Sequence, residues 1–344
     1  MDRIEQTVRL QDPGELVAAI PHILGFHPDN SLVLITVRGP THCLGPCVRT
    51  DLVPSSDAQA FADYLVGLTE QHDIAGVIIA VIDGTTAARH DSLPQEALVR
   101  RVTDTFTAKD IPVGYSVWAS STRNGAPWHS YVDGRTGTVP DPTSTPVAAM
   151  AVFAGEVTFG SREALATVLM HDVEPEVLKR RAGALVDEVG VAAVERNLNR
   201  DSLARAGLRA IRRAIEHALN GHLPTSDEEV IPLVIALSDP LVVEACLALS
   251  LNDHADVAEQ VWLALVRGVP APYRAEPAVL LAVSAHLQGN GAMAQIALDN
   301  AEDAKPRHPF AQLLRAAFIT GMSPADLASL IAEGAARNPL IRAE

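Results

Sequence analysis

The turn over residues 25–31 (GFHPDNS) gathers an imidazole, a carboxyl group and a hydroxyl directly before an apolar run typical of a buried strand. Arg49 and Asp51 fall on the segment predicted to return beside that strand. A histidine within hydrogen-bond reach of a carboxylate can act as a general base. The candidate catalytic residues are therefore His27, Asp29, Ser31, Arg49 and Asp51. The alternative is structural, with Asp29 as a turn former and His27 packed beneath the turn.

A second group of candidates is predicted for ligand binding. Asp83 follows the apolar run Ala75–Ile82, and α/β sheets bind ligands beyond the carboxyl ends of their strands. Three large aromatic side chains in the same part of the chain could line a cleft. The candidate ligand-binding residues are Asp83, Trp118, Trp128 and Tyr131. The alternative is an ordinary strand-end turn at Asp83 and core packing of the aromatic side chains.

Metal, phosphate and nucleophile motifs are weak or absent in this sequence. Cys43 and Cys47 have a spacing found in zinc sites, with His22 and His27 nearby, but a structural site needs a second pair of ligands. The chain contains no Walker A motif, no Gly-x-Gly-x-x-Gly and no Gly-x-Ser-x-Gly. We therefore expect no bound metal and no cofactor.

One helix carries a basic face. Arg205, Arg209 and Arg212 recur at helical spacing, inside a stretch 178–213 with nine basic and four acidic residues. A nucleic-acid-associated regulator is one reading of this face. The net charge of −15 opposes it, because phosphate contacts need a basic surface, so we expect a solvated or internally paired face and no nucleic-acid partner.

Composition points to a globular cytoplasmic protein. Its 344 residues are 48% hydrophobic and only 20% charged, enough for a full core. Three cysteines provide no disulfide framework, which favours a reducing compartment. The N-terminal residues show no apolar leader, and the apolar runs are too short to span a membrane.

The first 160 residues predict an α/β domain. A capped helix begins at Asp12-Pro13, and strands are predicted at Ser31–Val37, Val48–Val53, Ala75–Ile82 and Val113–Ala119. Helices are predicted at 57–71 and 93–107, and a polar hairpin at 128–139. This order predicts a mixed sheet in a three-layer arrangement with right-handed crossovers. A Pro-rich linker follows at 140–146, and the run 147–155 fits either a strand or a buried helix.

Residues 161–344 predict an all-α domain, because strand patterns cease near residue 160. Within it, Gly289, Ala294, Leu298, Ala301 and Pro306 follow the residue order of the second half of a tetratricopeptide unit. We expect one such helical hairpin near 275–308, although its usual aromatic residues are missing. A plain Ala-rich bundle is the alternative.

Several motifs resemble an actinobacterial family known as domain of unknown function 4192. They are Val8–Leu10 with Asp12–Leu16, Pro21–Pro28 running into Ser31–Val33, Arg49–Leu52, Ser161–Glu163 and Gly289–Ala297. The resemblance covers most of the chain and implies an α/β N-terminal part in a cytoplasmic protein, with no established activity. Gly289-Asn290-Gly291 departs from the frequent Gly-Asp-Gly of that family, a change expected to affect only the turn.

The sequence favours a binding or scaffolding protein over an enzyme. Stacked helical hairpins form surfaces suited to protein segments, so we expect a protein partner and consider a homo-oligomer. Two alternatives remain open: a hydrolase-like or small-ligand-binding enzyme using the Phe26–Ser31 turn with Arg49 and Asp51, and the nucleic-acid-associated regulator.

Overall fold

The capping residue predicted for the first helix begins it in the structure. The structure is a computed structural model that describes residues 12–39, 43–69, 74–85, 93–153 and 155–342. At the start of α1 (Pro13–Leu24), Asp12 Oδ1 accepts the N–H of Glu15 at 3.0 Å. Gly25 ends the helix with φ 79°, a left-handed conformation that glycine adopts without strain. Val8–Leu10 of the family motif lies outside the described residues.

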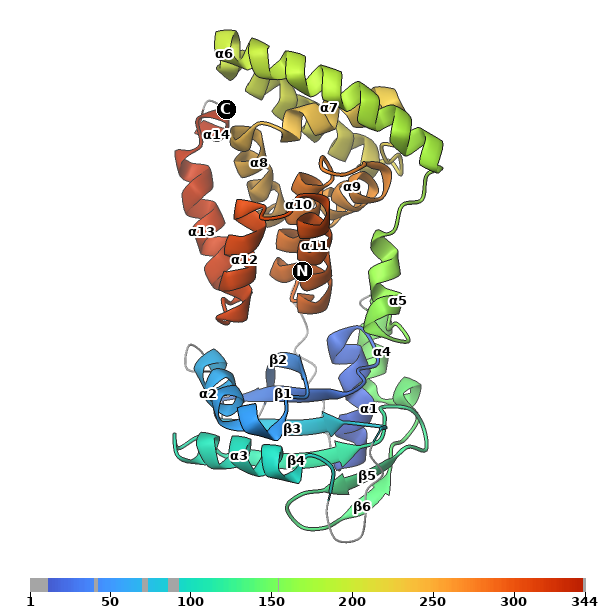
Figure 1. The fold of residues 1–344 in the computed structure, drawn as a ribbon, viewed down its shortest axis with the longest axis vertical. Coiled ribbons are helices and arrows are strands. Elements are labelled where there is room, and N and C mark those ends of the chain that lie inside the picture. The colour runs from blue at the N-terminus through green and yellow to red at the C-terminus, as the bar shows by residue number, and fades with distance from the viewer. Residues whose placement is uncertain (1–11, 40–42, 70–73, 86–92, 154, 343–344) are drawn as a thin grey trace. The chain divides into compact units, whose positions relative to one another are not determined.

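The chain divides between Leu165 and Ala166 into two compact units. The first contains a six-stranded sheet in the order β2-β1-β3-β4-β5-β6 (Figure 1). The strands are β1 (Ser31–Arg38), β2 (Cys43–Asp51), β3 (Gly76–Ile82), β4 (Val113–Ala119), β5 (Pro127–Ser130) and β6 (Thr136–Thr138). The helices are α1, α2 (Ala58–Thr69), α3 (Glu96–Thr107), α4 (Pro146–Phe153) and α5 (Arg162–Ala166), which ends at the boundary.

The sheet is mixed, as predicted. β3 and β4 pair in parallel, and every other neighbouring pair is antiparallel. Because β1 is antiparallel to both β2 and β3, those two strands point the same way on either side of it. Ser31 at the start of β1 is therefore paired with both Asp51 at the end of β2 and Ile82 at the end of β3.

Both faces of the central strands are buried, which explains their continuous apolar sequences. On one face, Leu34, Ile79 and Trp118 pack against α2 and α3, which lie side by side (Figure 1). On the other face, Val33, Ile35 and Ala80 are fully buried, and α1 contacts β2, β4, β5 and α4. Residues 146–153 form helix α4. The run at 147–155, which fitted either a strand or a buried helix, is therefore mainly helical.

The second unit is helical. Its helices are α6 (Pro175–Leu219), α7 (Asp227–Leu237), α8 (Pro240–Leu247), α9 (Ala255–Gly268), α10 (Ala275–Leu287), α11 (Gly291–Ala304), α12 (Pro309–Ile319), α13 (Pro324–Arg337) and α14 (Pro339–Arg342). Among the described residues, β pairing ends at Phe159, as predicted. No single helix of this part of the chain is long and apolar enough to cross a membrane.

α6 is one helical run broken at Asn199, whose φ of −153° and ψ of 57° are not helical. Arg181 contacts Asp227 and Arg196 contacts Ser238, so the first half runs parallel to α7. Gly207 packs on Ala236 after the break, so the second half runs back along α7. Residues 189 and 190 continue the first half of the helix.

α10 and α11 form the predicted helical hairpin. Gly289 between them has φ 84°, and Asn290 caps α11 by accepting the N–H of Met293 at 3.0 Å. Ala294, Leu298 and Ala301, three of the residues that suggested a tetratricopeptide unit, are fully buried. The repeat likeness itself stays a prediction.

Candidate functional site

One edge of the sheet brings most of the predicted site residues together. β2, β3 and β4 end at this edge and β1 begins there. The strand register therefore places Asp51, Ser31 and Asp83 close to one another at the same edge. Ser31 and Asp83 are almost completely buried, whereas the Asp51 side chain is 79% exposed. The sheet-edge cluster, as we name it, consists of His27, Asp29, Ser31, Arg49, Asp51 and Asp83.

Arg49 is the centre of this cluster. Its Nε donates to Ser31 Oγ at 2.8 Å, and its Nη2 lies 2.8 Å from Asp51 Oδ1. Ser31 Oγ in turn donates to the backbone carbonyl of Asp29 at 2.5 Å. The Ser31 hydroxyl donates its proton to a carbonyl and accepts from a guanidinium, so neither a carboxylate nor an imidazole of the described residues is bonded to it. These contacts fasten the turn to β2.

His27 faces a different partner from the predicted one. Its Nδ1 shares a hydrogen bond of 2.7 Å with Thr122 Oγ1, in the segment after β4, while the carboxylate of Asp51 is paired with Arg49. Burial, then the positive charge of Arg123 and the proximity of His22, lower the pKa of His27 from its ordinary 6.5. The imidazole is therefore neutral at pH 7, and the His27–Asp51 pair needed for base catalysis is not the pairing that the structure shows.

Two segments that sequence reasoning did not select as site residues complete this edge. Thr122 and Arg123 follow β4 as Asp83 follows β3, so the parallel pairing of the two strands was the available signal. The family-like turn at Ser161–Glu163 also lies at this edge, because Arg123 Nη2 donates to the carbonyl of Gly160 at 3.3 Å. Hydrogen bonds that the Glu163 carboxylate accepts from a backbone N–H and from Ser161 lower its pKa. The positive charges of Arg162 and Arg49 lower it further.

The predicted ligand-binding residues lie in packed surroundings. Asp83 Oδ1 accepts the N–H and hydroxyl of Thr85 at 2.9 and 2.6 Å, which closes the turn after β3. The Tyr131 hydroxyl donates to the carbonyl of Pro94 at 2.5 Å, and burial with the charges of Asp83 and Glu96 raises its pKa. Their proposed ligand role stays a prediction.

The two tryptophans are also packed. Trp118 is 2% exposed and lies in the core beneath α2 and α3, beside the ring of His129. Trp128 fills the space above Gly14 and Gly137, where a methyl group would meet its ring at 2.7 and 2.9 Å. A ligand would have to displace this packing to reach either ring.

The described residues contain no group of three or more metal-ligating side chains. Cys47 is half-buried, and burial raises the pKa of its thiol to about 12, which removes thiolate at neutral pH. His22 Nε2 donates to the carbonyl of Pro142 at 3.0 Å. The Cys43 side chain and His42 lie outside the part of the chain whose side chains are described.

The basic face of α6 is not uniform. Arg205 and Arg209 are exposed, whereas Arg212 is half-buried. Burial raises the pKa of the Cys246 thiol, and the positive charge of Arg212 partly opposes that rise. The buried residues of this half are Ala204, Leu208, Ile211, Ile215 and Ala218, on the side away from Arg205 and Arg209.

An apolar surface that the sequence reasoning missed lies on the first half of α6. Val186 and Val194 are 63% and 64% exposed, and Gly183, Gly190 and Ala193 share their face by helical spacing. We name these five residues the outer face of α6. Added methyl groups at either glycine would meet no atom within 4 Å. The signal was present as valines and glycines three and four residues apart, within a helix otherwise rich in charge.

The family model described as domain of unknown function (DUF4192) matches residues 13–325. The chain belongs to this family. The match covers both units and includes the sheet-edge cluster and the outer face of α6. No curated protein and no solved structure matches the chain.

Proposed function

We propose that this DUF4192 protein is a cytoplasmic binding and scaffolding protein whose helical unit contacts protein partners through the outer face of α6. The partner that this face fits is a second copy of the chain. The observation that carries the proposal is that Val186 and Val194 are exposed. On the opposite side of the same helix, Leu185 and Arg181 are buried.

Charge supports a second copy as the occupant. Chains with a net charge of −15 repel one another, so an interface between copies should lie where charged side chains are fewest. The five residues of the outer face of α6 are valine, alanine and glycine, with the exposed Asp187 beside them at the same helical spacing, and the two glycines allow close approach of a facing helix. A two-fold axis through this face would place the same residues on both copies.

The sheet-edge cluster supports a structural role more than catalysis. Ser31, Arg49 and Asp51 satisfy one another, and His27 is bonded to Thr122. We therefore place the binding function in the helical unit.

Sedimentation equilibrium tests the proposal. The wild-type protein should dimerise, and Val186→Asp/Val194→Asp should weaken association about a hundredfold or more, because two apolar contacts of about 1.5 kcal/mol each are lost. Val157→Asp is the matched control, since Val157 is 66% exposed in the other unit. A wild-type protein that stays monomeric at high concentration, or a dimer unaffected by the double variant, would overturn the proposal.

A further inference from the structure

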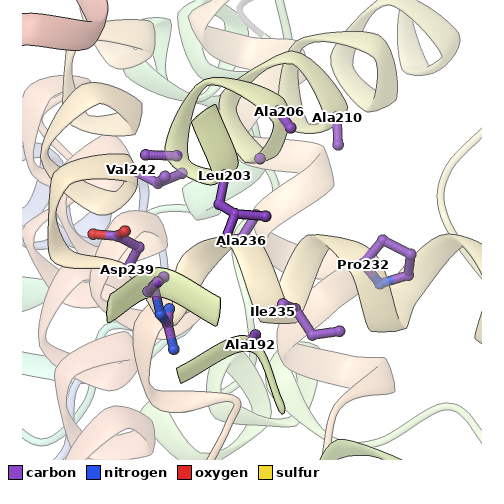
Figure 2. Close-up of a pocket in the computed structure, with 12 residues that line it drawn as sticks. Ala192, Leu203, Ala206, Ala210, Pro232, Ile235, Ala236, Asp239 and Val242 are labelled. Carbon is purple, nitrogen blue, oxygen red and sulfur yellow. The ribbon is translucent and has the colours of Figure 1, made fainter. Parts of the chain in front are cut away.

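An apolar groove of about 280 Å³ lies between the two halves of α6, α7 and the start of α8. It exists because α6 reverses at Asn199 and packs on α7 from two sides. Figure 2 shows Asp239 and Pro232 on opposite sides of the view, with Leu203 and Ala236 between them. We name this space the α6 groove. Its apolar wall includes Leu203, Ala206, Ala210, Pro232 and Ile235.

The α6 groove is polar at one end only. Arg196 Nη1 donates to Ser238 Oγ at 2.8 Å, and Ser238 directly follows the last residue of α7. Pro232 lies inside α7, and Ala210 falls near it because the second half of α6 runs back along α7. The groove therefore runs from a guanidinium at the end of α7 to an apolar wall in the middle of that helix.

Arg196 is the charge that a ligand can reach at the polar end. It is half-buried, and its guanidinium is bonded only to Ser238 among the side chains that the structure describes. Asp239, the other charged residue of the lining, is already engaged, because its Oδ1 accepts the N–H of Leu241 at 3.0 Å and lies 3.4 Å from Arg200 Nη2. The Asp239 side chain is only 4% exposed, so a ligand meets the arginine and not the carboxylate.

These surroundings favour an anionic ligand with an apolar body. The groove lies against the stretch 178–213, which has nine basic and four acidic residues in a chain of net charge −15. A guanidinium has about five N–H donors, so the bond to Ser238 leaves donors for a carboxylate. Because the rest of the wall is apolar, the ligand that fits combines one carboxylate with a hydrocarbon chain.

We propose that the α6 groove binds a medium-chain carboxylic acid such as octanoate. The carboxylate accepts N–H bonds from Arg196, and the hydrocarbon chain packs on Leu203 and Ile235. From Leu203 to Ala210 the helix rises about 10 Å, at about 1.5 Å per residue. An extended chain of about eight carbons, with C–C bonds of about 1.5 Å, matches this length. The groove is also small among ligand pockets, which span roughly 300–1,000 Å³, and this limits the chain length.

Isothermal titration calorimetry of the full chain with butanoate, hexanoate, octanoate and dodecanoate tests the proposal. Affinity should rise about fourfold for each added methylene group up to octanoate and then level off, because longer chains extend beyond the groove. Octan-1-ol and octylammonium have the same chain without the carboxylate. Both should bind about ten- to a hundredfold more weakly than octanoate, because they lose the charged hydrogen bonds to Arg196.

Three variants separate the two ends of the groove. Arg196→Gln should weaken octanoate binding about tenfold and leave octan-1-ol binding unchanged, because the glutamine amide is uncharged. Ala210→Leu fills the apolar end, so it should remove the gain from hexanoate to octanoate and leave butanoate binding unchanged. Arg209→Gln is the matched control, since Arg209 is exposed on the same helix half and lies outside the groove lining. Thermal melts show that each variant is folded.

The dimer variant Val186→Asp/Val194→Asp should bind octanoate as the wild-type protein does, so failure of the dimer and failure of this site are distinguishable. Octanoate binding by that variant alone would mean that a second copy fills the groove, and it would overturn the proposal. The proposal is also overturned by a folded wild-type protein that binds no octanoate at millimolar concentration, by an affinity independent of chain length, or by unchanged octanoate binding in Arg196→Gln.

Discussion

Two adjacent arginines on α6 share one carboxylate and differ in burial. Arg181 is 2% exposed; its Nε donates to Asp227 Oδ1 at 2.6 Å, its Nη1 to the carbonyl of Gly268 at 2.6 Å, and its Nη2 to the carbonyl of Thr225. Arg180 reaches the other oxygen of Asp227 at 2.6 Å but is 62% exposed. The buried guanidinium joins α6, α7 and the end of α9, whereas the exposed one is screened by water.

Arg181→Ala should therefore lower the free energy of unfolding by about 3–5 kcal/mol, because carbonyl groups and a carboxylate are left without their buried donor. Arg180→Ala, one residue away on the same carboxylate, should leave stability nearly unchanged. Urea denaturation of both variants measures the difference. Equal effects would contradict the assignment of Arg181 as the structural residue.

We expect His27 to contribute both to the stability of the fold and to its dependence on pH. His27→Ala should cost on the order of 1–3 kcal/mol, because the buried Thr122 loses its hydrogen-bond partner. Since the folded-state pKa lies below the ordinary 6.5, protonation favours the unfolded state, and the wild-type protein should lose stability as pH falls below about 6.5. His27→Ala should lose the part of this pH dependence that His27 contributes. Thermal melts between pH 8 and pH 5 test both; an unchanged melting point would return His27 to the candidate catalytic residues.

At the scale of elements, α7 begins with a capping box. Glu229 Oε2 accepts the N–H groups of Thr225 and Ser226 at 3.1 and 3.0 Å, and its Oε1 lies 2.5 Å from His222 Nε2. The hydrogen bonds from His222 and then from the backbone lower the pKa of Glu229 to about 2. The carboxylate therefore stabilises the fold fully above its ordinary pKa of 4.5, and that stabilisation is lost as pH falls toward 2.

Glu229→Gln should destabilise the protein by about 0.5–2 kcal/mol at pH 7, within the range of helix caps. The difference from wild type should shrink as pH falls from 4.5 toward 2, because the wild-type carboxylate is then protonated and uncharged, like the glutamine amide. Denaturant titrations at neutral and acidic pH measure this convergence. Asp326, which closes the equivalent box on α13, provides a comparison through Asp326→Asn.

Elements with strong local patterns were predictable from the sequence. The run at Val113–Ala119 became β4 with the same bounds, and Asp12 caps α1 as expected, because these features depend on neighbouring residues. The partner of His27 was not predictable, since Thr122 lies 95 positions away and meets it only through strand order. The packing of α7 against both halves of α6 was equally hidden, because it requires a helix reversal at a single residue, Asn199.

At the scale of the whole molecule, each unit buries its own core. Ile79 is fully buried beneath α2 and α3 in the first unit, and Leu281 is 1% exposed on α10 in the second. Units with separate cores are able to unfold as separate cooperative transitions. This makes the domain division measurable by calorimetry.

Ile79→Ala and Leu281→Ala should each remove about 2–5 kcal/mol from the unit that contains the residue, as large-to-small core substitutions do. Differential scanning calorimetry of the full chain should show two transitions, with Ile79→Ala shifting one and Leu281→Ala the other. The two variants are matched in residue size and burial. A difference between the shifts of the two transitions would therefore reflect a difference between the units and not between the substitutions. If both variants shift a single common transition, the two cores unfold together, and the independence of the units is contradicted.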